Sequence, residues 1–380
     1  MELMIALGVG MLVLGTAVQL FSKSVNAAFV VSQRAEMQQN ARAASNLMTK
    51  DISLAGAGLP SGGIALASGT ASSPVYGCSY GTPAACFLGA TGSSAINYPT
   101  QTVGASTIRY MYGVIPGCAT GIKVTPTGPA TDTITVVYSD NTFLLNDYTV
   151  AFLNPAGTQI RFTLPSPAPN PLDQAVTNTA VGLQAGDLIL FQNQLGAGLG
   201  ATSGYAVGEV TAPLPTGTGP SYTVNFANAD PLLFNQTAAT SGDMAQISAG
   251  TGTVATRIWA ITYYLKVLPD PLGVGAGTPV LMRQVNGRAP VPVAENVANL
   301  QFTYDTYDTS GNLLNASCDG GQSVGISPNL IRNINILHLT FRSQLAGGST
   351  STAGALNGFQ GYDVQTSISA RNLSFSQRYD

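Results

Sequence analysis

Charged residues are scarce in this chain of 380 residues. Asp, Glu, Lys and Arg together make up 9% of the sequence, and the formal net charge is −3. Nucleic-acid binding needs a surface rich in Lys and Arg, so this composition argues against that function. Hydrophobic residues nevertheless make up 45% of the chain, which is enough to bury a core and argues against disorder.

Side chains for catalysis or zinc binding are also few. His338 is the single histidine, and no His/Cys set has zinc spacing. No glycine-rich string lies between a clear strand and a helix, as a phosphate loop requires. Residues 321–325 read Gly-Gln-Ser-Val-Gly, a G-x-S-x-G string centred on Ser323, but loop residues flank it on both sides. We therefore predict no enzyme, no catalytic residue and no cofactor.

Asp305, Asp308 and Asn312 are weak candidates for a calcium site, because their oxygens lie close together in the sequence. With Gly311, the same residues also fit an ordinary hairpin turn. We favour the turn, since the spacing of an EF-hand loop is not present. No metal site is therefore predicted.

Turn-forming residues are plentiful. The chain contains 43 glycines and 22 prolines, and short apolar runs alternate with stretches rich in Thr, Ser and Asn. This sequence pattern is typical of many strands joined by turns. We therefore predict an α+β protein whose β-rich head covers residues 57–380. The predicted strands are 132–139, 148–153, 160–164, 187–192, 222–227, 257–267, 280–285, 300–307, 334–342 and 366–375.

The N-terminal segment is predicted to be one long helix. Residues 3–22 carry no charge and, as a helix, would span about 30 Å, the thickness of a bilayer core. No proline or glycine occurs from Lys23 to Ala55, and Gly56 then favours a helix end. We place the helical domain at residues 1–56. A cleavable signal peptide is one alternative, but no basic region precedes the apolar run and the helix pattern continues past the possible cut near Ala27. A plain membrane anchor is the other, but it does not account for Glu2 at the start of the run.

The first residues resemble a known signature. Glu2-Leu3-Met4-Ile5-Ala6-Leu7 is similar to the Glu-Leu-Met core of the type IV prepilin motif. The run of residues 40–56, from Asn40 to Gly56, resembles the helix exit of PilW-type minor pilins and of the J-type pseudopilins of type II secretion. Residues 261–265, 281–283, 293–304, 331–337 and 370–373 resemble the later strands of the same family. The resemblance covers the helix and the family-like sheet at about 256–380, whereas residues 61–255 are poor in motifs.

The resemblance implies a structural subunit, a minor pilin or related filament protein, that is stored in the bacterial inner membrane with its head outside the cytoplasm. Its helix would then pack against those of other pilin subunits in an extracellular filament, with a tip adhesin as a further partner. Glu2 would be neutralised by a neighbour's N-terminal amine and so set the register. Gly8, Gly10 and Gly15 would permit close helix contact. In the family a basic leader precedes the glutamate, so we expect residues upstream of Met1.

Two other functions remain open from the sequence. A membrane-anchored adhesin would carry the same head and helix but would not polymerise. A secreted enzyme is disfavoured by the single histidine. The presence of Glu2 together with the pilin-like string favours the filament subunit, because an anchor needs neither.

The four cysteines suggest two disulfides in an exported head. Cys78 and Cys86 are eight residues apart, with turn-forming residues between them, so we favour this pair. Cys118 and Cys318 would then form a long-range bridge. Buried free thiols are the alternative.

The C-terminal segment is predicted to be the last strand of the head. Residues 366–375 alternate, but the apolar phase changes from Ile368 and Ala370 to Leu373 and Phe375, which suggests a bulge. We expect Leu373 and Phe375 to pack against the second half of the helix, near Leu47 and Ile52.

Overall fold

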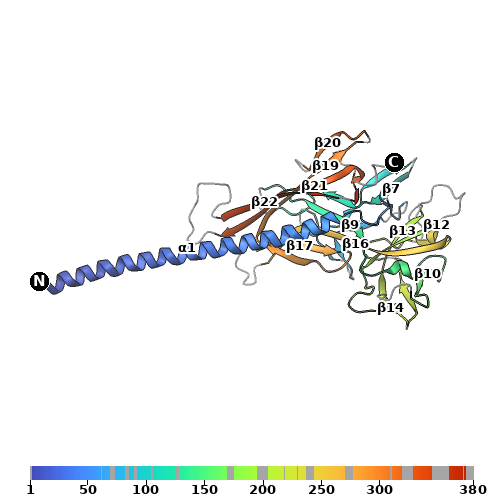
Figure 1. Ribbon diagram of the computed structural model, residues 1–380, viewed down its shortest axis with the longest axis horizontal. Coiled ribbons are helices and arrows are strands. Elements are labelled where there is room, and N and C mark those ends of the chain that lie inside the picture. The colour runs from blue at the N-terminus through green and yellow to red at the C-terminus, as the bar shows by residue number, and fades with distance from the viewer. Residues whose placement is uncertain are drawn as a thin grey trace.

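The computed structural model has one long N-terminal helix and a large antiparallel β-rich body (Figure 1). Helix α1 (Glu2–Ser53) projects far beyond the body and enters it only with its second half. The structure describes residues 2–60, 62–68, 73–81, 85–89, 92–103, 106–124, 128–168, 175–194, 204–217, 219–228, 230–236, 244–269, 277–308, 310–318, 328–344, 359–370 and 372–373.

Helix α1 packs on the body through one stripe of side chains. The buried apolar residues recur at spacings of three or four, as one face of a helix requires: Met37, Ala41, Ala44, Met48 and Ile52. These side chains face strands β18, β21 and β22. Complete burial of Met48 and Ile52 contributes about 1.5–3 kcal/mol for each side chain.

The helix ends where glycine permits a sharp change of direction. Gly56 has φ +79°, and its N–H donates to the carbonyl of Val137 on the neighbouring strand. A Cβ atom at this position would lie 2.7 Å from Cδ2 of Leu373. Glycine is therefore required here both by the left-handed backbone and by the close approach of the C-terminal segment.

A seven-stranded sheet forms the centre of the head, and its longest strand is β16 (Thr251–Leu268). Strands β12 (Leu188–Gln194) and β17 (Thr278–Val285) pair with successive parts of one edge of β16, and β9 (Thr133–Ser139) pairs with the other edge. The sheet is completed by β13 (Tyr205–Glu209), β18 (Val291–Glu295) and β8 (Val114–Gly117). The motif-poor and family-like parts of the head thus share one sheet.

A second sheet of four strands also contacts α1. Its order is β20 (Leu313–Ser317), β19 (Val297–Tyr307), β21 (Ile331–Gln344) and β22 (Phe359–Ser369). The inward side chains of these strands join those of the central sheet and of α1 in one hydrophobic core. Both sheets thus pack against the buried stripe of α1.

Smaller elements build the rest of the head. A four-stranded sheet contains β10 (Thr149–Phe152), β11 (Gln159–Thr163), β15 (Ser221–Asn225) and β14 (Thr211–Thr216). A three-stranded sheet contains β1 (Ile64–Ala65), β7 (Ser106–Met111) and β6 (Thr100–Val103). Two pairs are formed by β2 (Val75–Tyr76) with β5 (Ile96–Asn97) and by β3 (Cys78–Ser79) with β4 (Ala85–Cys86). Short helical elements are α2 (Met244–Ser248), η1 (Leu145–Asp147) and η3 (Pro328–Leu330).

The α+β layout expected from the sequence is present, but the C-terminal strand differs from the prediction of residues 366–375. Strand β22 begins at Phe359 and ends at Ser369. The N–H of Leu373 donates back to the carbonyl of Ala370, so the chain turns there and the change of phase marks a turn instead of a bulge. Leu373 packs against the core that contains Ile52, whereas Phe375 lies outside the described residues.

Candidate functional site

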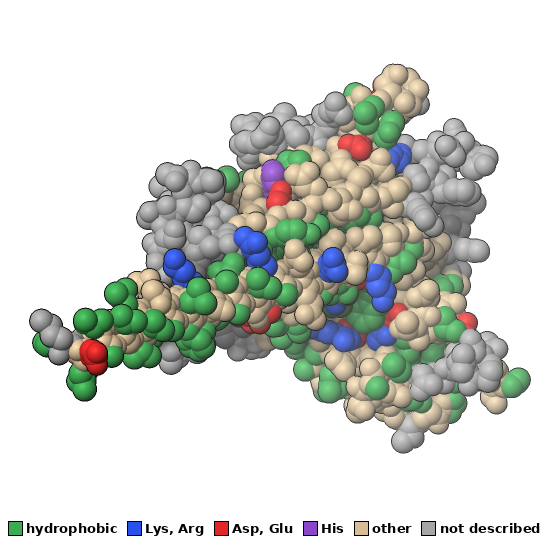
Figure 2. Space-filling view, turned by 60° about the vertical axis from the view of Figure 1, so that its left-hand side comes forward, with side chains coloured by type: hydrophobic (Ala, Val, Ile, Leu, Met, Phe, Trp, Pro, Cys, Tyr) green, Lys and Arg blue, Asp and Glu red, His purple; other side chains and the backbone are tan. Residues whose placement is uncertain are grey.

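The first half of α1 is an exposed apolar surface. Every residue from Glu2 to Phe29 is exposed, a range that we call the exposed segment. Its large side chains include Leu3, Leu12 and Phe21, which are 77%, 71% and 72% exposed. Among the described residues, α1 is the one helix long and apolar enough to cross a membrane, and none of its most apolar window is buried. The side chains on its visible face are mostly hydrophobic (Figure 2).

Glu2 and the three glycines of the exposed segment lie on this open surface. Glu2 stands in the first turn of α1, and no ion partner for it occurs among the described residues. A Cβ atom placed on Gly8, Gly10 or Gly15 would meet nothing within 4 Å. The single chain therefore leaves these positions free to contact another molecule.

The buried end of α1 is held by a polar contact. Asp51 is 2% exposed, and its Oδ2 accepts hydrogen bonds from the Tyr263 hydroxyl at 2.6 Å and from Arg283 Nε at 2.7 Å. Burial alone would lower the pKa of Arg283, but the hydrogen bond and charge of Asp51 raise it. Burial and Asp51 also raise the pKa of Tyr138, on β9, to about 12. Arg283 therefore stays charged and fixes the helix to strand β17.

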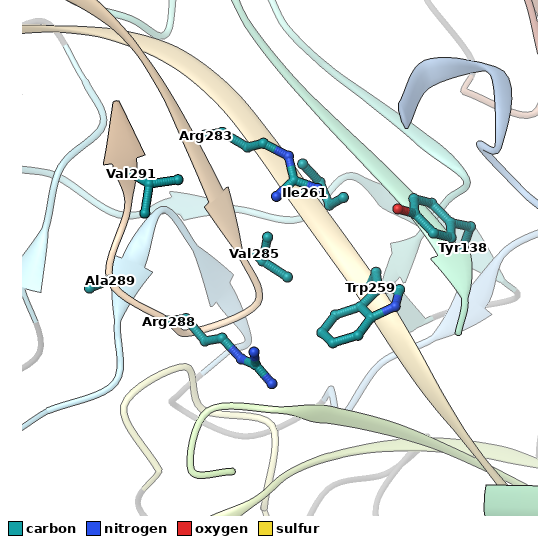
Figure 3. Close-up of a pocket in the computed structure, with 8 residues that line it drawn as sticks. All are labelled: Tyr138, Trp259, Ile261, Arg283, Val285, Arg288, Ala289 and Val291. Carbon is teal, nitrogen blue, oxygen red and sulfur yellow. The ribbon is translucent and has the colours of Figure 1, made fainter. Parts of the chain in front are cut away.

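A pocket lies beside this contact, on the face of the central sheet that carries α1 (Figure 3). Its volume is about 350 Å³. Strands β9, β16, β17 and β18 and the turn between β17 and β18 supply its lining: Tyr138, Trp259, Ile261, Arg283, Val285, Arg288, Ala289 and Val291. Figure 2 shows Lys and Arg side chains gathered around a hollow on this side of the head.

Two arginines hold Trp259, the only tryptophan of the chain. The guanidinium carbons of Arg257 and Arg288 lie 4.6 Å and 5.3 Å from the Trp259 ring centroid. Asp140 accepts a hydrogen bond from Arg257 Nε at 2.7 Å, and Asp187 accepts from Arg288 Nη2 at 2.7 Å. Both carboxylates are buried, so they hold the guanidinium groups of Arg257 and Arg288 in place against the Trp259 ring.

The candidate calcium residues form the expected turn, and their carboxylates do not converge. The Asn312 side-chain amide donates to Asp308 Oδ2, and the backbone N–H groups of Asn312 and Ser310 donate to its Oδ1, and these bonds lower the pKa of Asp308. Asp305 instead accepts from the side-chain amides of Asn333 and Asn335 on β21. Among the described residues, no group of three His, Cys, Asp or Glu side chains is placed to hold a metal ion.

His338 pairs with an aspartate of the neighbouring strand, and the serine-hydrolase string lies outside the described residues. His338 Nδ1 lies 2.7 Å from Asp363 Oδ2 on the neighbouring strand β22, where both side chains are partly exposed. Ser323 and its flanking glycines lie outside the described residues. His338 therefore has a structural partner within its own sheet.

Two disulfides join the four cysteines: Cys78 with Cys86, and Cys118 with Cys318. These are the pairs that the sequence favoured. The first closes the β3–β4 hairpin, where the two cysteines face each other. The second links the end of β8 to the end of β20 across 200 residues of sequence. The second link thus ties the motif-poor part of the head to the family-like sheet.

Sequence reasoning did not identify the pocket or a buried acid pair. Glu209 and Asp230 are 0% and 3% exposed, and Glu209 Oε1 accepts no hydrogen bond from the residues that the structure describes. Burial and the adjacent Asp230 raise the pKa of Glu209 well above its ordinary value. The single tryptophan was the one sequence signal that could have led to the pocket, whereas residues 209 and 230 have no local pattern in common.

Comparison with known proteins found no matching family, no matching curated protein and no matching solved structure.

Proposed function

We propose that this chain is a structural subunit of a type IV pilus or a related filament, similar to a minor pilin, and that it assembles through its N-terminal helix. Before assembly it is a single-pass protein of the bacterial inner membrane, with its head outside the cytoplasm. After assembly it is part of an extracellular filament. The proposal rests on one observation above all: the exposed apolar segment continues as the same helix that is packed into the head.

The apolar side chains of the exposed segment are stable only when another apolar surface buries them. Burial of one large apolar side chain contributes about 1.5–3 kcal/mol, so covering about ten of them contributes roughly 15–30 kcal/mol. That amount exceeds the net stability of a typical domain, which is about 5–15 kcal/mol. Before assembly, lipid buries these apolar side chains, and after assembly the equivalent helices of other subunits bury them.

Glu2 distinguishes the filament from a simple anchor. A carboxylate at the start of an apolar helix is costly in lipid and is retained where it has a partner. In a filament, a positive group on a neighbouring subunit neutralises Glu2, and the pair fixes the axial register of the two helices. Gly8, Gly10 and Gly15 leave the helix surface flat enough for close contact.

A membrane-anchored binding protein that does not polymerise is the second candidate. The pocket beside Trp259 favours it, because a site of about 350 Å³ is in the size range of ligand pockets. Such a protein would keep the exposed segment in lipid and would have no use for Glu2.

Photo-crosslinking from Leu12 separates the two candidates. A photoreactive residue replaces Leu12, which is 71% exposed, and Val254 on β16 of the head, 46% exposed, serves as the control position. In filaments sheared from the host cells, we expect Leu12 to give adducts with the helix of another subunit. Adducts with lipid alone, together with no chain in the sheared fraction, would support the anchored protein.

A further inference from the structure

The pocket beside Trp259 offers hydrogen-bond donors over an apolar floor. Arginine and tryptophan side chains only donate, and among the eight lining side chains only the Tyr138 hydroxyl can accept. The remaining lining side chains are aliphatic: Ile261, Val285, Ala289 and Val291. A complementary ligand therefore carries acceptors on one side and an apolar body on the other.

Two donors in the pocket have no partner among the described residues. Arg288 binds Asp187 through Nε and Nη2, and no hydrogen bond engages its Nη1. Trp259 Nε1 has no hydrogen bond either within the described part of the chain. In Figure 3 the Arg288 side chain extends from the β17–β18 turn toward the Trp259 ring, and the indole nitrogen lies on the edge of the ring away from Arg288.

The donors are held in place by buried groups. Asp187 is 0% exposed and fixes Arg288 with hydrogen bonds of 3.0, 2.7 and 3.0 Å. Asp51 fixes Arg283, and Arg257 contacts Trp259 from within the head. Side chains fixed in this way lose little freedom when a ligand binds, which favours recognition.

We propose that this pocket binds a carboxylate that is attached to a small apolar body, such as a branched aliphatic chain. The Arg288 guanidinium, whose Nη1 has no partner among the described residues, is suited to a carboxylate, and the aliphatic floor is suited to the body. The three arginines around the pocket, at positions 257, 283 and 288, face three aspartates, at 51, 140 and 187. Because these opposite charges balance, binding of the carboxylate depends on the position of the hydrogen-bond donors more than on the net charge of the pocket. The inference is independent of the filament role.

Such a carboxylate has two sources: a peptide chain end, or a free organic acid. N-acetyl-L-leucine represents the first, and 4-methylpentanoate represents the second. N-acetyl-L-leucinamide has the same apolar body without the charge. Titration of the full chain in detergent with each probe, followed by Trp259 fluorescence and by calorimetry, measures binding. Trp259 is the single tryptophan, so its fluorescence reports on this pocket alone.

We expect saturable binding of at least one acid and at least tenfold weaker binding of the amide. Preference for N-acetyl-L-leucine would identify a peptide end, and equal or tighter binding of 4-methylpentanoate would identify a free acid. The neutral amide also controls for partitioning into detergent, since it enters micelles at least as readily as the acids. Equal binding of acid and amide, or no saturable binding of either acid by both methods, would overturn the proposal.

A matched pair of variants places the binding in the pocket. Val291 and Leu313 are both exposed strand residues, each 51% exposed, but only Val291 lines the pocket. Val291→Asp puts a negative charge at the pocket, so we expect at least a tenfold loss of affinity for the acid. Leu313→Asp adds the same charge on β20 and should leave affinity unchanged. Equal affinity of the two variants would show that the acid binds elsewhere and would overturn the assignment.

Discussion

The carboxylate of Asp51, at the end of α1, lies 2.7 Å from Nε of Arg283 on β17, although 232 residues separate them in the sequence. This ion pair joins the helix that carries the exposed segment to the central sheet of the head. The side chain of Asp51 is 3% exposed and that of Arg283 is 21% exposed, so the pair is largely shielded from water. Because Asp51 lies on α1 and Arg283 lies on β17, the ion pair fixes the helix to the head.

Asp51→Asn should lower the free energy of unfolding by about 2–4 kcal/mol, because it leaves Arg283 and the Tyr263 hydroxyl without their charged acceptor. Urea unfolding of a shortened chain of residues 23–380, which omits only exposed residues of α1, measures the change. Lys50→Gln changes the charge of the exposed neighbouring residue and serves as the control. Equal losses in the two variants would show that the ion pair does not hold the helix.

Ile368→Ala should destabilise the head by about 2–5 kcal/mol, because Ile368 on β22 is 4% exposed and belongs to the core shared with α1. Ser367→Ala, at the adjacent exposed position, should have little effect. Removal of residues 366–380 should lower the thermal midpoint further, since it takes away part of β22 and Leu373. A truncated chain that melts at the wild-type temperature would show that the C-terminal segment is dispensable.

The two disulfides should differ in their contribution to stability. In the chain-entropy model, the link between Cys118 and Cys318 stabilises by roughly 5 kcal/mol and that between Cys78 and Cys86 by roughly 2–3 kcal/mol, because the first closes a far longer loop. Replacing each pair by serine and comparing denaturant midpoints tests the order. A larger loss for the Cys78/Cys86 replacement would contradict the loop-length argument at these sites.

Stability should fall as the pH rises through the titration of Glu209. Burial and the adjacent Asp230 raise the pKa of Glu209 well above its ordinary value of 4.5, so the folded chain keeps a proton that the unfolded chain releases. The contribution of Glu209 is therefore complete below pH 4.5 and is lost as the pH rises from there to the raised pKa.

Glu209→Gln should flatten the decline of the melting temperature that begins above pH 4.5, since the amide cannot ionise. Glu295→Gln, at an exposed position of β18, should keep the wild-type pH profile. The same decline in the Glu209 variant as in the wild type would show that this carboxyl does not control the pH dependence.

The sequence predicted the elements whose signals are local. Helix α1 was predicted because an apolar run of 20 residues is followed by a stretch without glycine or proline. Ala44, Met48 and Ile52, near its end, are buried against the head. Val25 and Val31, earlier in the same helix, are exposed, because the head covers only its second half. Strands such as β16 and β19 were predicted because they are long and alternate.

Short strands and long-range contacts were not predictable in the same way. Strands of two residues, such as β1 and β2, have too few side chains to show a period. The pocket is assembled from Tyr138, Trp259, Arg288 and their neighbours on four strands and a turn, and no local pattern relates these positions. Asp51 has no local signal that distinguishes it from the other polar residues of the helix, because its partner Arg283 is far away in the sequence.

The central claim is that the exposed segment assembles subunits and that Glu2 sets their register. Glu2→Ala removes the one charge at the start of the apolar run, so membrane insertion should remain while the chain in sheared filaments falls at least tenfold. Glu36→Ala removes an exposed carboxylate farther along the same helix and should assemble normally. Quantifying the chain in membrane and sheared-filament fractions of host cells is the decisive measurement. Glu2→Ala filaments at the wild-type level would contradict the role of Glu2 in assembly.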